Sequence, residues 1–498
     1  MISQHLPILQ IVVPLLAAPL CVLLRQRHAV WAFALGVCWA SFGVALALLL
    51  RVMNDGPLVY ELGGWAAPWG IVYRLDPLGG IVLLIVSGVA ALVLVFAPRV
   101  LDQEIPADKH YLFFAAFLLC MTGLLGITIT GDIFNVFVFL EISSLSAYVL
   151  ISMGADRRAL LAAYRYLVMG TIGSTFILIG IGLAYMMTGT LNMADLAARL
   201  GDVHETRTIR AAFAFLTVGV SIKLALFPLH VWLPNAYTYA PSMVTAFLAA
   251  TATKVSCYLL LRLVFTVFGV PLVFDEMRLA AVFMPLALMA IFVASTVAIF
   301  QTNVKRLLAY SSVAQIGYLV LAFGFASQAG VTACVIHLFN HALMKGALFL
   351  ALGCVAFRIG SVDLEDLRGL GRRMPWIAAL IVIGGLNLIG VPLTAGFISK
   401  WYLVMAALEQ REYWPVAVAM LFSSLLAVAY VWRIVEVLYM QPPRPSDLQS
   451  DQREAPVPLS MVAPTTVMTL GTVVLGVYPT FTVQVAQRAA ELLLGVAA

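Results

Sequence analysis

Residues 331–356 form the sequence VTACVIHLFNHALMKGALFLALGCVA. This apolar run is long enough for a helix that crosses a bilayer, which needs ~20 predominantly apolar residues. It nevertheless contains His337, His341 and Lys345 at regular four-residue intervals. At that spacing successive side chains drift by only ~40° around an α-helix, so the three share one stripe. The stretch therefore predicts a membrane helix with one ionisable face.

The whole 498-residue chain has the same apolar character. Hydrophobic residues make up 63% of it and charged residues 11%, well below the roughly 25% charged residues of soluble domains. Lipid is therefore the natural solvent, and hydropathy predicts an all-α polytopic membrane protein with about fourteen spans. Their approximate ranges are 6–24, 30–50, 78–97, 111–129, 133–152, 162–187, 209–231, 243–266, 279–300, 307–326, 331–356, 376–407, 415–438 and 457–477.

The loops carry further information. With the N-terminus outside, the inner loops hold more Lys and Arg than the outer ones, which favours both termini outside. Residues 51–77 contain Gly-Gly and Pro-Trp breaks between short β-prone runs, which predicts a small hairpin at the outer surface. Residues 441–456 are polar and Pro-rich, which is typical of a flexible inner loop. The segment after Pro479 has the pattern of an amphipathic helix lying on the membrane.

Two spans are interrupted. Residues 220–234, VSIKLALFPLHVWLP, contain Pro228, and residues 384–401, GGLNLIGVPLTAGFISKW, contain Gly390 and Pro392. Proline disrupts a helix and frees backbone groups, which in lipid must face protein or water. Broken spans in two halves of a chain indicate inverted repeats around a mid-membrane site. We therefore expect N-terminal helices with the hairpin in 1–110, repeats in 111–266 and 279–438, and the inner loop, last span and C-terminus in 439–498.

Ionisable side chains recur inside the apolar spans. They are Glu141, Lys223, Lys254, His337, His341, Lys345 and Lys400. The glutamate and four lysines together would cost on the order of 12–17 kcal/mol to place at helix centres, as much as a typical folding stability of roughly 5–15 kcal/mol. Such residues persist only when they pair, stay neutral or border water. Because histidine exchanges protons near neutral pH, this series predicts a proton path.

Structural roles are the alternative to a path. Single buried Lys or His residues are often only structural, but several in separate spans are hard to explain in that way. HLFNH has neither the HExxH pattern nor a third ligand nearby, so we expect no metal site. His230, Ser143, Ser144, Ser242 and Thr245 are weaker candidates, since they could pack helices or line a water wire. Motifs for nucleotide binding, catalysis, Fe–S or zinc sites are absent from the sequence, so we expect no catalytic residues and no cofactor. A net charge of +5 reflects loop residues and predicts no nucleic-acid face.

Four long motifs make the sequence recognisable. They are GDIFNVFVFLEISSLSAYVL at 131–150, KLALFPLHVWLPNAYTYAPSMVTAFLAATATK at 223–254, KRLLAYSSVAQIGYLVL at 305–321 and HLFNHALMKGALFLALG at 337–353. They resemble the proton-conducting antiporter-like subunits shared by complex I, Mrp-type Na+/H+ antiporters and energy-converting hydrogenases. The resemblance covers about residues 75–435, and the wording of the motifs is most similar to the D-type subunits of Mrp antiporters.

This resemblance implies fourteen spans, two inverted five-helix repeats with broken helices, and a hydrated charged axis in the membrane plane. By motif match, the axis runs from a glutamate–lysine pair to a distal lysine that exchanges protons with one side. Its members in order are Glu141, Lys223, Lys254, His337, His341, Lys345 and Lys400.

The expected function is that of a proton-translocating subunit of a multi-subunit Na+/H+ antiporter in the bacterial inner membrane. Its expected partners are other membrane subunits, protons, Na+ and lipid. Carboxylates in the spans are too few for a Na+ cage, so Na+ is expected to cross in a neighbouring subunit. One alternative is the proton-pumping membrane subunit of an energy-converting hydrogenase or an NADH-quinone oxidoreductase-type complex. Another, from a different class, is a stand-alone solute or ion symporter.

Overall fold

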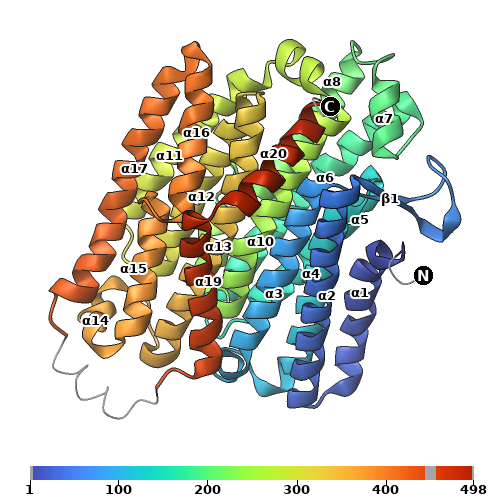
Figure 1. Ribbon diagram of the computed structural model, residues 1–498. Helices are drawn as coiled ribbons and strands as arrows, with labels where there is room; N and C mark the ends of the chain where they lie inside the picture. The colour runs from blue at the N-terminus through green and yellow to red at the C-terminus, as the bar shows by residue number, and fades with distance from the viewer. Residues whose placement is uncertain (1–3, 444–455, 496–498) are drawn as a thin grey trace.

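The computed structural model describes residues 4–443 and 456–495, which form a bundle of long helices (Figure 1). Within these ranges twelve helices are long and apolar enough to cross a membrane. They are α1 (Leu6–Leu24), α2 (Arg27–Asp55), α3 (Pro77–Glu104), α4 (His110–Ile129), α5 (Ile133–Ser152), α6 (Arg157–Thr188), α10 (Ser242–Leu261), α11 (Leu279–Ile299), α12 (Val304–Gly324), α13 (Gln328–Ile359), α17 (Trp414–Val435) and α19 (Leu459–Val477). Most of the predicted loop 441–456 lies outside the described residues.

Both predicted helix breaks are present. Ala225 and Gly390 end the first half of each broken span in the left-handed conformation, at φ 61° and φ 87°. The halves are α8 (Arg207–Leu224) with α9 (Trp232–Tyr239), and α15 (Pro375–Ile389) with α16 (Ala395–Glu409). Neither broken span belongs to the twelve, so the expectation of about fourteen spans remains a prediction.

The shorter elements lie at the ends of the bundle. The predicted hairpin is confirmed, because β1 (Leu58–Glu61) pairs antiparallel with β2 (Val72–Leu75). The other short helices are α7 (Met193–Leu200), α14 (Leu370–Arg373) and α20 (Thr480–Leu494). Single helical turns occupy Leu62–Gly64, Ala107–Lys109, Arg262–Val267, Pro271–Glu276, Leu364–Leu367, Arg411–Tyr413 and Glu436–Met440.

Helix α20 corresponds to the expected membrane-surface helix, but its apolar face is covered by other helices of the bundle. It crosses α13 obliquely in Figure 1 and packs against α13 and α3. Val485, Ala486, Ala489 and Ala490 are buried in this contact. Small side chains allow two helices to approach closely, which explains why the apolar face of α20 lies against protein.

Two similar backbone connections support the inverted repeats. Before α5, the Ile133 N–H donates to Leu191 O at 2.9 Å, and before α12 the Val304 N–H donates to Val362 O at 3.0 Å. The first connection is followed by the short helix α7, and the second by the helical turn Leu364–Leu367 and then α14. Figure 1 shows α7 at the upper end of the bundle and α14 at the lower end. The same local structure therefore recurs upside down, while the exact repeat boundaries at 111–266 and 279–438 remain predictions.

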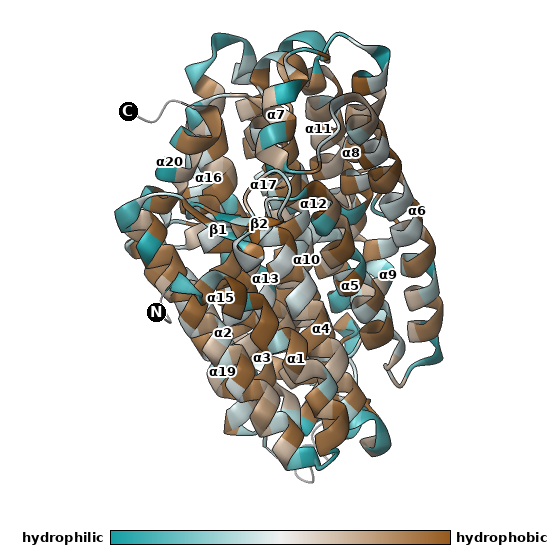
Figure 2. Cartoon of the chain, turned by 90° about the vertical axis from the view of Figure 1, so that its right-hand side faces the viewer, coloured by the Kyte–Doolittle hydropathy of each residue, from teal (hydrophilic) through white to brown (hydrophobic). Residues whose placement is uncertain are grey.

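The outer surface is apolar around the middle of the bundle. Figure 2 shows hydrophobic residues along the helices and hydrophilic ones gathered towards the two ends. Large apolar side chains such as Leu16, Tyr164 and Phe422 are more than half exposed, at 60%, 62% and 65%. Exposed apolar area of this extent fits contact with lipid or with other membrane subunits. The chain is therefore a multi-pass membrane protein.

Candidate functional site

Glu141 and Lys223 lie opposite each other, as expected for a pair. The Lys223 Nζ is 3.9 Å from the nearer Glu141 carboxylate oxygen, and the two side chains are 5% and 29% exposed. The Lys223 amine donates to the Ser144 hydroxyl at 2.9 Å. On the other side, the Ser174 hydroxyl of α6 donates to the Glu141 carboxylate. The lysine charge is thus compensated by a carboxylate that itself remains partly open to its surroundings.

The helix break positions Lys223. It is the second-last residue of α8, just before Ala225 turns the backbone into the left-handed region. The break frees carbonyl groups that the helix would otherwise use. The Trp232 indole of α9 donates to one of them, Ile222 O, at 2.9 Å. This contact joins the two halves of the span and holds the end of α8 beside α5.

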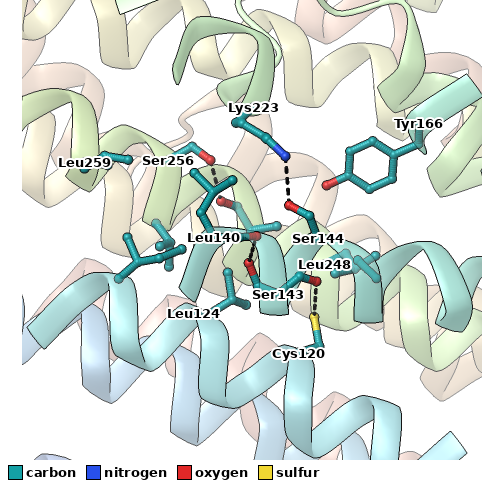
Figure 3. Close-up of a pocket in the computed structure, with 14 residues that line it drawn as sticks. Cys120, Leu124, Leu140, Ser143, Ser144, Tyr166, Lys223, Leu248, Ser256 and Leu259 are labelled. Carbon is teal, nitrogen blue, oxygen red and sulfur yellow. Dashed lines mark hydrogen bonds between the residues drawn. The ribbon is translucent and has the colours of Figure 1, made fainter. Parts of the chain in front are cut away.

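A small cavity adjoins the pair. It has a volume of about 30 Å³ and is lined by Lys223, Ser143, Ser144, Tyr166 and Ser256, among others. Figure 3 shows the Lys223 amine directed towards the Ser144 hydroxyl at this cavity. The Ser143 hydroxyl instead donates to Leu140 O within its own helix, at 2.9 Å. The space is sufficient for ordered water beside the Lys223 amine.

Lys254 is fully buried in the middle of the bundle. It lies on α10, and its amine donates to Ala249 O at 2.5 Å and to the Thr253 hydroxyl at 3.4 Å. Within the described part of the chain no carboxylate forms an ion pair with it. Helix α10 packs against α13, the helix that carries His337 and His341.

The two histidines stack. Their ring centroids are 5.8 Å apart, with an angle of 13° between the ring planes. The His337 Nδ1 is 3.0 Å from the Ser399 hydroxyl of α16. The His337 Nε2 and both ring nitrogens of His341 are buried with no hydrogen-bond partner among the described groups. Because buried polar atoms normally bond to protein or water, these nitrogens indicate positions for ordered water.

Lys345 continues the stripe on α13 but is directed to another helix. Its amine donates to Leu308 O at 2.9 Å and to the Ser311 hydroxyl, both on α12. The three residues keep the i, i+4, i+8 spacing of one stripe on α13. Their side chains reach different neighbours, His337 the Ser399 hydroxyl of α16 and Lys345 the Ser311 hydroxyl of α12.

Lys400 lies on α16, the second half of the other broken span. Its amine donates to Leu388 O at 3.1 Å, to Ile389 O at 2.8 Å and to the Ser424 hydroxyl at 3.0 Å. The two carbonyls belong to the end of α15, where the break frees them. A Cβ added at Gly390 would lie 2.9 Å from the Lys400 Cδ. Glycine is thus required there both by the backbone angle and by the position of the lysine.

The weaker candidates occupy different surroundings. The His230 ring stacks on Phe227 at 5.2 Å, and its Nδ1 is buried without a partner in the described structure. The Thr245 hydroxyl donates to Tyr237 O at 3.0 Å, which is a structural contact. Ser242 belongs to a separate cluster at the lower end of the bundle. Pro228 lies between α8 and α9, and Pro392 between α15 and α16.

Some residues of the site were not predicted from the sequence. Tyr148 lies on the same side of α5 as Glu141 and Ser144, at the i, i+3, i+7 spacing of one helix face. This spacing could have identified Tyr148 as a residue of the site from the sequence. Its buried hydroxyl has no partner among the described residues. A Cβ at Gly170 would overlap this hydroxyl and lie 3.5 Å from the Lys223 Nζ. Ser174 gave no comparable signal, because serine on a small-residue helix usually serves packing.

The ionisable groups form three clusters rather than one continuous hydrogen-bonded chain. The first is the Glu141–Lys223 pair, the second surrounds Lys254 and the histidines, and the third surrounds Lys400, while Lys345 makes a separate contact with α12. The Tyr318 ring connects the last two, with its centroid 5.8 Å from that of His337 and 5.1 Å from the Lys400 amine. Proton transfer between the clusters requires bridging water, which carries hydrogen bonds nearly as well as direct contact.

Curated relatives match almost the whole chain. NADH-quinone oxidoreductase subunit N of Desulforudis audaxviator is 40% identical over 490 residues, 96% of each chain. The D-type subunit of the Na(+)/H(+) antiporter of Alkalihalophilus pseudofirmus is 31% identical over 438 residues, covering 86% of this chain and 87% of that protein.

Solved structures agree with these relatives. A chain of the archaeal membrane-bound sulfane sulfur reductase superposes with a TM-score of 0.90 at 31% identity, covering 98% of both chains. A chain of the Mrp complex from Dietzia sp. gives a TM-score of 0.90 at 25% identity, covering 100% of this chain and 98% of that one. The family described as "NADH:quinone oxidoreductase/Mrp antiporter, TM" matches residues 130–427. The resemblance of the four motifs is thus confirmed, and the chain belongs to the NADH:quinone oxidoreductase/Mrp antiporter family.

Proposed function

We propose that this chain translocates protons as a membrane subunit of a multi-subunit complex. The observation that carries the proposal is the buried Lys223 amine, which lies at a helix break 3.9 Å from a half-buried Glu141 carboxylate. A charge inside a membrane helix is costly and marks an ion pathway by default. Here the compensating charge is on a different helix, so a shift of either helix changes the compensation.

The mechanism is charge-coupled. While the pair is close, the Glu141 carboxylate stabilises the Lys223 ammonium group. When the pair separates, the lysine releases its proton into the adjoining cavity, and water carries it towards Lys254. From there it passes along the stripe of α13, formed by His337, His341 and Lys345, to Lys400, which releases it to one side. The energy comes from partner subunits or from an opposed cation flow.

The first candidate for the complex is a Na+/H+ antiporter. The relative from the Na(+)/H(+) antiporter of Alkalihalophilus pseudofirmus and the chain of the Mrp complex both match nearly end to end. The distribution of Lys and Arg favours both termini outside a bacterial inner membrane. Na+ crosses in a neighbouring subunit, because carboxylates in these spans are few.

A second candidate is supported by the 40% identity to NADH-quinone oxidoreductase subunit N over 96% of both chains. In that case the same proton path is driven by electron transfer in partner subunits. The path through this chain is identical in both candidates, and only the driving reaction differs.

The test uses everted vesicles that contain the complete complex, with a fluorescent probe of the pH gradient. We expect Lys223→Ala and Lys400→Ala to lower proton flux at least tenfold, whereas Lys109→Ala leaves it unchanged because Lys109 is exposed. Flux that depends on added Na+ supports the antiporter, and flux that depends on an electron donor supports the pump. Unchanged flux in both path variants would refute the proposal. Transport by the purified single chain would instead support a stand-alone symporter.

A further inference from the structure

A wide cavity opens near the end of α3 and the start of α12. It has a volume of about 520 Å³ and lies where α3 and α13 end and α12 begins. We call it the lower vestibule. Its charged lining residues are Glu104, Asp156, Arg158, Lys305, Arg306 and Asp363.

Three residues from three helices form a hydrogen-bonded chain at the wall of the lower vestibule. The Lys305 Nζ of α12 donates to the Ser242 hydroxyl of α10 at 3.0 Å. That hydroxyl donates to one carboxylate oxygen of Glu104 on α3 at 2.6 Å. Lys305 is only 7% exposed and Ser242 is fully buried, whereas Glu104 is partly exposed. Two hydrogen bonds thus connect the more exposed carboxylate of the vestibule wall to an almost buried amine of the same wall.

The other charged groups of the vestibule are engaged elsewhere or lack this inward link. Asp156 pairs with Arg158 at 2.7 Å. Asp363 accepts from the Asn303 side chain at 2.7 Å. Arg306 adds a positive charge, but arginine does not lose its proton in proteins. Glu104 is therefore the lining carboxylate with a hydrogen-bonded connection into the bundle.

The chain leads towards the middle of the proton path. Lys305 begins a helix on which Leu308 and Ser311 follow, and both accept hydrogen bonds from the Lys345 amine. The six positions from Lys305 to Ser311 correspond to a rise of ~9 Å along the helix. Transfer from Lys305 to Lys345 therefore needs bridging water between the two contacts. Lys345 thus donates to the same helix that carries Lys305.

We propose that the lower vestibule is a proton-uptake site that feeds Lys345 through Glu104, Ser242 and Lys305. Glu104 takes a proton from water in the vestibule. It passes this proton to the Ser242 oxygen while the hydroxyl proton of Ser242 moves to the neutral Lys305 amine, and the hydroxyl then turns back. Lys305 becomes neutral again when it releases its proton towards Lys345. This inference rests on the proposed function, since it supplies protons to the same axis.

A structural role for the chain is the competing explanation. Glu104 also accepts the Ser242 backbone N–H at 2.6 Å, which caps the first turn of α10. The test therefore needs variants that keep the fold contacts and remove only proton transfer. Lys305→Arg keeps a positive donor but cannot deprotonate. Glu104→Gln keeps an oxygen that accepts the backbone N–H but cannot carry a proton.

The experiment measures proton flux by the complete complex in everted vesicles, corrected for the amount of assembled complex. We expect Lys305→Arg and Glu104→Gln to lower flux at least tenfold, because neither variant can relay a proton. Ser242→Ala is expected to do the same, while Ser242→Thr restores the hydroxyl and most of the flux. Asp363→Asn is the matched control, since it removes a vestibule carboxylate outside the chain and leaves flux unchanged.

The outcomes separate the two proposals. Normal flux in Lys305→Arg and Glu104→Gln, with flux lost in Lys400→Ala, would overturn the uptake site and leave the proposed function intact. Normal flux in Lys400→Ala as well would overturn the proposed function itself. If the charged variants fail to assemble, the comparison of Ser242→Ala with Ser242→Thr decides, and equal flux in these two overturns the relay.

Discussion

Neutralising Glu141 tests the charge-coupled step most directly. Glu141→Gln keeps the size of the side chain and an oxygen that can accept from Ser174, but removes the charge 3.9 Å from the Lys223 Nζ. At an effective dielectric constant of about 20, two unit charges at this distance attract by ~4 kcal/mol. Water near the partly exposed carboxylate reduces this value. The ammonium form of Lys223 nevertheless loses a stabilisation large enough to change the ratio of its charged to its neutral form by more than tenfold, since each 1.4 kcal/mol is about a factor of ten.

The assay is proton flux in everted vesicles containing the whole complex, with complex content measured in parallel. We expect Glu141→Gln to lower flux at least tenfold with unchanged assembly. Glu409→Gln is the matched control, because Glu409 is exposed at the end of α16 and forms no contact with the path. Its flux should equal that of the unmodified chain.

A double-mutant cycle makes the reasoning refutable. If Glu141 and Lys223 act as one unit, the Glu141→Gln/Lys223→Met double variant is no slower than Lys223→Met alone, because residues that work together are not additive. Flux losses that multiply in the double variant would show independent roles. Normal flux in Glu141→Gln would remove the pair from the mechanism altogether.

Three other perturbations have defined outcomes. Gly390→Ala should destabilise the chain by ~1–2 kcal/mol, because residue 390 has a left-handed backbone conformation. It should also lower proton flux, because the added methyl group would displace the side chain of Lys400. Measuring the melting temperature and the proton flux of the variant tests both effects. Gly170→Ala should lower flux because its methyl group would overlap the Tyr148 hydroxyl, and Tyr148→Phe on that background should restore part of it. Burial opposes the charge of Asp76, but attraction and a hydrogen bond from Arg262 outweigh it, so the pKa of Asp76 lies below its ordinary value. Ionised Asp76 therefore stabilises the folded chain at pH values above the pKa of aspartate in the unfolded chain, and this stabilisation is lost as the pH falls through the lowered pKa of Asp76. Arg262→Met should make the melting temperature depend less on pH in the acid range.

The sequence predicted the elements whose signals are local. Apolar length indicated the long helices, Gly-Gly and Pro-Trp breaks indicated the hairpin, and proline with lysine indicated both broken spans. The burial of Lys254 followed from its place in an apolar run. These features depend on short stretches of chain and on the cost of charge in lipid, so no tertiary information was needed.

Features that depend on contacts between helices were not predicted. Periodicity placed Lys345 on one stripe with the histidines, but only packing decides that its amine faces α12. Ser174 carries no charge to mark it, and its role arises because α6 lies against α5. Glu104 and Lys305 lie at span ends, where charged residues are ordinary, so their connection through Ser242 is visible only in three dimensions.

The two helix breaks hold their lysines differently, and this difference distinguishes the two ends of the proposed path. At the first break Trp232 satisfies the freed carbonyl of Ile222, so Lys223 is left to pair with a carboxylate. At the second break Lys400 itself donates to the freed carbonyls at the end of α15. The carbonyl end of a helix carries partial negative charge and favours a cation there. Loss of the proton from Lys400 therefore weakens the contact between α15 and α16. In the proposed mechanism, proton release from Lys400 is thus linked to movement of α16. The proton on Lys223 is linked instead to the distance between α5 and α8.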